Sequence, residues 1–180
     1  MDRRTRSGTR TAPSNRMTDR GTGDTTADTR LRRPIIGALL LGIGLGGFFD
    51  GIVLHQILQW HHLIDHAGVP PDSVENLRLN ILADGIFHAA TYAFTVAGVL
   101  VLWSADRRRT GPWPWTVLAG GLLAGWGGFN LVEGIINHHL LGLHHVRPGE
   151  HQLLYDLGFL AWGAAMLVIG VLLLRSAVRR

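Results

Sequence analysis

The sequence predicts an all-α integral membrane protein, a four-helix bundle that runs up-down-up-down and is built from two repeated helical hairpins. Three observations predict this fold. Four apolar runs are long enough to cross a bilayer, the arginines gather in alternate connecting segments, and one polar motif recurs at a fixed offset. With 47% hydrophobic residues and a mean hydropathy of +0.19, the chain is one membrane domain with a polar tail rather than a soluble globule.

Residues 1–33 precede the first apolar run and are rich in Arg, Thr, Asp, Gly and Ser. A segment with so few apolar residues cannot bury a core, so we expect a disordered cytoplasmic tail. Anionic lipid and membrane topology explain its arginines, and we expect no nucleic-acid partner. The membrane domain then comprises residues 34–180.

The apolar runs lie at about residues 35–60, 79–103, 115–141 and 153–174. Each is long enough for a transmembrane helix, because about 20 helical residues cross the hydrocarbon of a bilayer. The connections are short, so we expect sequential helices to be antiparallel neighbours. Asp72-Ser73-Val74-Glu75, before the second run, resembles a capping box that opens the second helix.

The chain's 17 basic residues are all arginine, and their positions predict the orientation. Nine precede the first span, three fill positions 107–109 and three follow the fourth span, whereas only Arg78 and Arg147 fall in the other two loops. The positive-inside rule therefore places both termini in the cytoplasm. The loops after the first and third spans face outward.

The repeated motif is the most informative feature of the chain. An acid, a glycine and an isoleucine are followed at plus five by a histidine, and at plus eleven and plus twelve by a histidine pair. The polar members of the two copies, 83 positions apart, are Asp50, His55, His61 and His62, and Glu133, His138, His144 and His145. Ionisable groups in membrane spans are rare and usually functional, so the function should be sought here.

The other two spans carry polar groups as well. The acid-Gly-Ile triplet appears a third time at Asp84, followed by His88, and the fourth span contributes Tyr155 and Asp156 near its outer end. The helical rise of about 1.5 Å per residue places all these groups in the outer half of the membrane. Asp84 and His88 lie on one helical stripe, which favours them as paired ligands.

The angle between the two polar groups of each repeat is less favourable. Five residues turn an α-helix by about 140°, so Asp50 and His55 do not share a face, and neither do Glu133 and His138. Two alternatives follow. Either one member of each pair faces the bundle centre and the other a neighbouring helix or an aqueous vestibule, or a local distortion brings both inward.

Carboxylates and imidazoles that converge in a helix bundle predict a transition-metal site. The deep candidate ligands are Asp50, His55, Asp84, His88, Glu133 and His138. The histidine pairs His61-His62 and His144-His145 are weaker candidates, because they could also form a funnel, support the ligands or be solvated. Tyr155 and Asp156 are candidate proton-transfer groups. Without cysteine, the donors suit one or two ions of Fe, Zn, Mn or Cu(II) better than Cu(I). The alternative to a metal is hydrogen bonding among these groups across helices.

The run from Gly47 to Gln56, and the later run from Leu143 to Gly149, resemble a bacterial family of small four-span membrane proteins catalogued as a domain of unknown function. The resemblance covers about residues 33–174 and implies a multi-pass protein of the bacterial inner (plasma) membrane. Members of such families tend to be encoded near copper-insertion factors for cytochrome oxidase. The resemblance therefore implies metal handling, with respiratory oxidase assembly factors as partners.

Three functions fit these observations. In the first, a bound metal near the outer leaflet activates water or dioxygen for a small-molecule substrate that arrives from the outer face. In the second, the site captures a metal ion from that face and passes it on. In the third, histidine pairs ligate b-type haem, which ranks last because it leaves the acids without a role. Whether the protein is an enzyme stays open at this point.

Overall fold

The computed structural model describes residues 22–109 and 111–179, and within these residues all regular structure is helical. Helix α1 (Thr22–Phe48) continues into the π-helix η1 (Phe49–Ile57), and α2 (Val74–Asp106) follows. Helix α3 (Trp115–Glu133) continues into the π-helix η2 (Gly134–Leu140), and α4 (Gln152–Val178) ends the described fold. The predicted all-α class is confirmed.

Four helical segments in the described part of the chain are long and apolar enough to cross a membrane. They are Arg30–Ile57, Val74–Asp106, Trp115–Leu140 and Gln152–Val178. The four predicted spans are confirmed, and α2 begins earlier than the apolar run because Ser73 caps it, accepting a hydrogen bond from the backbone N–H of Asn76 at 3.2 Å. Helix α1 begins at Thr22, within the segment that we expected to be a tail, and residues 1–21 lie outside the described residues.

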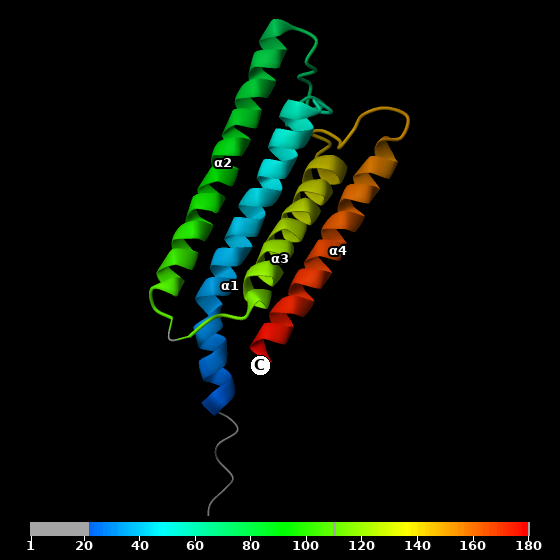
Figure 1. The fold of residues 1–180 in the computed structure, drawn as a ribbon. Coiled ribbons are helices and arrows are strands. Elements are labelled where there is room, and N and C mark those ends of the chain that lie inside the picture. The colour runs from blue at the N-terminus through cyan, green and yellow to red at the C-terminus, as the bar shows by residue number, and fades with distance from the viewer. Residues whose placement is uncertain (1–21, 110, 180) are drawn as a thin grey trace, which may run out of the picture.

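The helices stand in a row in the order α2, α1, α3, α4 (Figure 1). Helix α1 packs against α2 and α3, and α3 packs against α4. In the described residues the backbones of α2 and α3 stay apart, although Phe87 of α2 reaches Phe129 of α3, with ring centroids 6.1 Å apart. Gly121 and Gly125 of α3 lie against Ala38 and Leu39 of α1 so closely that a side chain has no room there. The two hairpins therefore meet through α1 and α3.

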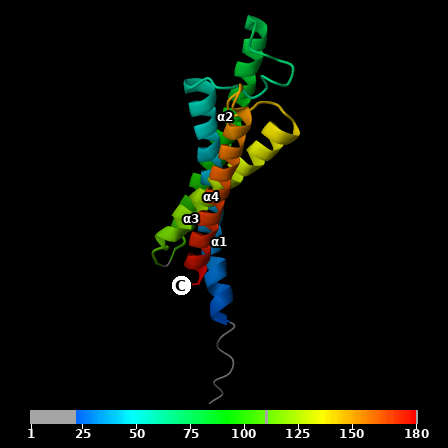
Figure 2. The ribbon, with the colours of Figure 1, turned by 90° about the vertical axis from the view of Figure 1, so that its right-hand side faces the viewer.

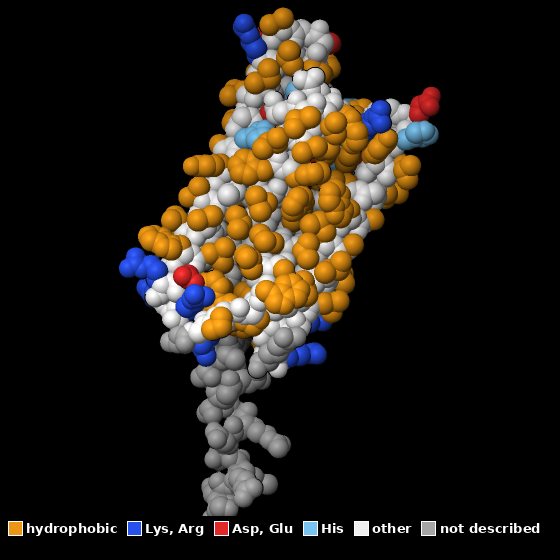
Figure 3. All heavy atoms as spheres, in the orientation of Figure 1, with side chains coloured by type: hydrophobic (Ala, Val, Ile, Leu, Met, Phe, Trp, Pro, Cys, Tyr) orange, Lys and Arg blue, Asp and Glu red, His pale blue; other side chains and the backbone are white. Residues whose placement is uncertain are grey.

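The row has a polar end that holds both interhelical loops of the hairpins, residues 58–73 and 141–151, which we call the loop end. Seen along the row in Figure 2, η1 (cyan) and η2 (yellow) diverge to opposite sides at the loop end. Figure 3 shows hydrophobic side chains covering the flank of the helices, with arginines below and above this band. An apolar band between charged ends is the surface that a membrane-spanning protein presents to lipid.

Candidate metal centre

The helices that carry the repeated motif become π-helical before they reach the loops. In η1 the N–H of Leu58 donates to the carbonyl of Val53 at 2.8 Å, and after η2 the N–H of Leu141 donates to the carbonyl of Ile136 at 2.8 Å. Hydrogen bonds between residues five apart place those residues above one another. A local distortion thus brings both polar groups of each repeat inward, which was the second of the two alternatives.

The pairs made by this distortion are close and buried. Nε2 of His55 lies 3.2 Å from Oδ2 of Asp50. Nε2 of His138 lies 3.1 Å from Oε1 of Glu133. All four side chains are at most 5% exposed, so each repeat contributes one carboxylate and one imidazole to the interior.

Each chain segment then reverses and folds the next histidine into the same space. The reversal uses a left-handed residue at equivalent positions, Gln59 with φ 50° and Gly142 with φ 56°. Nδ1 of His61 donates to the carbonyl oxygen of Val146 at 2.8 Å, and Nδ1 of His144 donates to that of Leu63 at 3.0 Å. Each repeat therefore orients a histidine of the other, and one histidine of each predicted pair is buried rather than at the mouth.

Asp84 of α2 holds the first repeat in place. Its Oδ1 accepts hydrogen bonds from Nδ1 of His55 and from the backbone N–H of Leu63, both at 2.9 Å. Its Oδ2 accepts from Nδ1 of His62 at 2.7 Å. Both oxygens of Asp84 therefore accept hydrogen bonds, and Asp84 contacts the Nδ1 side of His55, whereas Asp50 faces the Nε2 side.

Asp156 of α4 does the same for the second repeat. Its Oδ1 accepts from the backbone N–H of Val146 at 2.9 Å and lies 3.5 Å from Nδ1 of His138. Its Oδ2 accepts from Nδ1 of His145 at 2.8 Å. The two halves are therefore related by a pseudo-two-fold axis along the helices, as the parallel hairpin repeat predicts.

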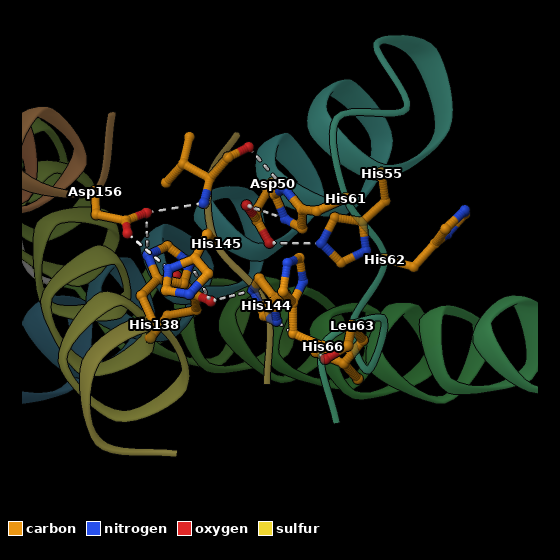
Figure 4. Close-up of polar contacts among 12 residues, drawn as sticks. Asp50, His55, His61, His62, Leu63, His66, His138, His144, His145 and Asp156 are labelled. Atoms are coloured by element: carbon orange, nitrogen blue, oxygen red, sulfur yellow. Dashed lines mark hydrogen bonds and ion pairs between the residues drawn. The ribbon is translucent and has the colours of Figure 1, made fainter. Parts of the chain in front are cut away.

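Six side chains form the inner cluster, with one carboxylate and two imidazoles from each repeat, and Figure 4 shows the two sets converging. They are Asp50, His55, His61, Glu133, His138 and His144. The rings of His61 and His144 stack across the pseudo-axis, with centroids 4.6 Å apart and an interplanar angle of 9°. Donor atoms of His55, His61 and His144 lie within 4.8 Å of one another, and so do those of Glu133, His138 and His144.

The inner cluster has more acceptors than protons to share. Nδ1 of His144 faces the carbonyl of Leu63, and its Nε2 lies 2.8 Å from Oε1 of Glu133. His55 also lies between two carboxylates, since Asp84 faces its Nδ1 and Asp50 its Nε2. A neutral imidazole has a single N–H, so one nitrogen of each ring needs a second proton or another cation.

Two of these histidines lie in the loops, outside the membrane spans. Burial, assisted by the nearby rings of His144 and His55, lowers the pKa of His61 to about 2. Burial also opposes a charge on His144, but the hydrogen bond to Glu133 outweighs it, and the pKa of His144 is raised. The two stacked rings at the pseudo-axis therefore have pKa values that are shifted in opposite directions.

The remaining predicted residues lie outside the inner cluster. Nδ1 of His88 donates to the backbone carbonyl of Asp84 at 2.6 Å, and the ring fills the space above Gly51. His62 and His145 stand behind the two aspartates and are 15% and 18% exposed. The Tyr155 hydroxyl accepts a hydrogen bond from Arg147 at 2.8 Å at the surface.

Comparison with protein families settles the membership of the chain. The family described as "Predicted membrane protein (DUF2243)" matches residues 37–177. The chain belongs to this family. The DUF2243 match includes all six side chains of the inner cluster, together with Asp84 and Asp156. No curated protein and no solved structure matches the chain.

Proposed function

We propose that this DUF2243 protein is a membrane metalloprotein whose inner cluster holds a resident transition-metal centre. One observation carries the proposal. Nδ1 of His55, His61 and His144 is engaged by an acceptor outside the cluster, so Nε2 of each ring is directed at the others and at the carboxylates. Metal-bound histidines have this arrangement, with the second nitrogen held by a carboxylate or a carbonyl.

The polar atoms that lack partners support the same conclusion. In the described residues, Oδ1 of Asp50, Oε2 of Glu133 and Nε2 of His61 are buried without a hydrogen-bond partner. Nε2 of His55 and Nε2 of His138 lie close to a carboxylate but make no hydrogen bond of good geometry. These atoms all belong to the inner cluster. An uncompensated buried polar atom is costly, and a cation shared among them offsets that cost.

The charges favour two divalent ions. Four carboxylates are buried at or behind the cluster, namely Asp50, Asp84, Glu133 and Asp156. The ion pairs found for them in the described residues are all with histidines, so no arginine balances their charge. Two divalent cations carry as much positive charge as four carboxylates carry negative, which suits a region of low dielectric constant.

The donor set defines the metal class and the chemistry. Each repeat offers two imidazoles and one carboxylate, the set that non-haem Fe(II) sites use, and Mn, Zn and Cu(II) accept the same donors. Such ions, when bound, activate water or dioxygen. The chain's own residues would hold the ions, orient them and exclude bulk water. The arginine distribution supports a position of this centre near the outer face of the membrane.

Elemental analysis of the purified protein tests the proposal. We expect wild type, expressed with ample metal, to carry two transition-metal ions per chain. The double variant Asp50→Asn, Glu133→Gln should lose both. A matched control, Asp72→Asn with Glu150→Gln, changes one exposed aspartate and one exposed glutamate and should retain them. Wild-type protein without metal or with a haem spectrum would refute the proposed centre.

A further inference from the structure

The two loops of the loop end differ where the repeat stops. The offset of 83 positions that relates the two copies would place a carboxylate and a histidine at 148 and 149, matching Asp65 and His66. The chain has Pro148 and Gly149 there instead. The first loop therefore carries a carboxylate–histidine pair that the second lacks, and the inner cluster does not use it.

His66 is oriented in the same way as the histidines of the inner cluster. Its Nδ1 donates to Oδ1 of Asp65 at 2.6 Å, and Oδ2 of Asp65 accepts the backbone N–H of His62 at 3.1 Å. The carboxylate is thus held in place and fixes the ring. With the proton on Nδ1, the lone pair of a neutral His66 ring lies on Nε2 and is free for a metal.

His66 lies beside a second histidine that is oriented likewise. Its ring centroid is 5.4 Å from that of His145, and the two rings meet edge to face. Nδ1 of His145 donates to Asp156, so the lone pair of this ring also lies on Nε2. Two imidazoles with available lone pairs are therefore adjacent at the loop end.

The two rings begin a series that leads inward. The His66 side chain is 39% exposed and that of His145 is 18% exposed, whereas that of His138 is fully buried. Ring centroids are 6.4 Å apart between His145 and His138, and 4.9 Å apart between His138 and His144. Neighbouring imidazole rings therefore lead from the surface to the inner cluster, and each ring contacts the next.

A different flank of the loop end is closed by packing. The guanidinium of Arg147 lies over the rings of Trp60 and Tyr155, at 5.2 and 5.4 Å from their centroids. These two aromatic residues pack on the apolar cluster of Leu54, Val146 and Phe159. An ion would have to break this packing to enter there, whereas the histidine series already offers ligands.

We propose that His66 and His145 form a capture site for a divalent transition-metal ion, which then passes by way of His138 to the inner cluster. The inference rests on the proposed metal centre and adds the route by which it is loaded. Two imidazoles bind a metal weakly in comparison with a full ligand set, because structural sites use about four protein ligands. An ion held only by His66 and His145 therefore exchanges readily and moves on.

The rate of loading tests this route. Metal-free full-length protein in detergent is mixed with a limiting amount of Co²⁺, and the visible absorption of the bound ion is followed in time. We expect His66→Ala to load several-fold more slowly than wild type and to reach the same final Co²⁺ content. His151→Ala, which removes another exposed histidine at the loop end, is the matched control and should load at the wild-type rate.

Each other outcome overturns the inference in a recognisable way. Equal rates for His66→Ala and wild type would refute the capture site and leave the inner centre standing. Equal slowing by His151→Ala would show that any exposed histidine attracts the ion. A lower final content in His66→Ala would make His66 a permanent ligand. Wild-type protein that binds no Co²⁺ would refute the proposed function itself.

Discussion

Asp84 and His55 are joined by a hydrogen bond of 2.9 Å from Nδ1 of the ring to the carboxylate, and Nε2 of the same ring faces Asp50 at 3.2 Å. The ring thus stands between a supporting carboxylate and an inner one. Asp156 supports His138 in the equivalent position of the second repeat. The two supports come from α2 and α4, so all four transmembrane helices contribute to one site.

Replacing a supporting carboxylate should weaken metal binding without removing a ligand. For Asp84→Asn we expect the affinity for the metal to fall by about 10- to 100-fold, because the amide no longer orients and polarises His55. Competition with a chelator of known affinity measures the change. Asp156→Asn should behave in the same way.

A control for these variants is Asp106→Asn, at the end of α2 opposite the loops, where the carboxylate forms an exposed ion pair with Arg109. Its metal affinity should equal that of wild type. If Asp84→Asn also keeps the wild-type affinity, Asp84 does not support a ligand.

Removal of the metal should lower the stability of the folded protein. A ligand that binds only the folded state stabilises it by about 2.7 kcal/mol when present at about 100 times its dissociation constant. We therefore expect chelation to lower the thermal unfolding midpoint and metal addition to restore it. The variant Asp50→Asn, Glu133→Gln should have the same thermal unfolding midpoint with chelator and with added metal. If the unfolding midpoint of wild type were the same with and without metal, the protein would not hold a resident metal centre.

The repeat points to all six side chains of the inner cluster in the sequence, because one offset relates both inner carboxylates and all the histidines of the motif. The equivalence of Asp84 and Asp156 could not be seen in this way. His62 and Asp84 are 22 residues apart, whereas His145 and Asp156 are 11 apart, so the shared offset is lost in the longer loop. A weaker signal in the sequence does relate the two aspartates.

That signal is a phenylalanine three positions after each supporting aspartate. Phe87 stacks on His55 with centroids 5.7 Å apart, and Phe159 packs against His138 at 5.5 Å. The π-helices could not be predicted from the sequence for another reason. The plus-five spacing shows that an α-helix does not bring both polar groups to one face, but it does not specify which distortion of the helix does so. The row order of the helices depends on close packing of α1 and α3, which short loops do not specify.

The pH dependence of stability should differ between the two stacked histidines. The unfolded chain gives His61 its ordinary pKa of 6.5, whereas burial lowers the pKa to about 2 in the fold. Between these values only the unfolded state takes up the proton, so His61 destabilises the metal-free fold as pH falls below 6.5. We expect His61→Gln to flatten the acid side of a plot of unfolding midpoint against pH.

His144 should act in the opposite sense. Its raised pKa means that it contributes stability below 6.5 that is lost as pH rises through the folded value. His144→Gln should therefore lower the midpoint of the metal-free protein more in acid than in base. Identical pH profiles for the two variants would contradict opposite pKa shifts of the two rings.

Substitutions at the two left-handed positions after the π-helices, Gln59 and Gly142, should change the free energy of unfolding by different amounts. Gly142 has φ 56° with open space where a side chain would project, so the cost of a substitution there is conformational rather than steric. Gly142→Gln should lower the free energy of unfolding by about 1 kcal/mol, the usual penalty of a left-handed non-glycine residue. Gln59→Gly should raise it by less, because glycine also makes the unfolded chain more flexible.

Chemical or thermal unfolding in detergent measures both changes, and elemental analysis provides the check on the site. Both variants should retain wild-type metal content, because Gln59 and Gly142 shape the reversal without donating a ligand. If Gly142→Gln lost its metal while Gln59→Gly kept it, the second turn would set the position of His144 more tightly than the first sets His61. The two repeats would then be equivalent in their metal ligands but not in the turns that position His61 and His144.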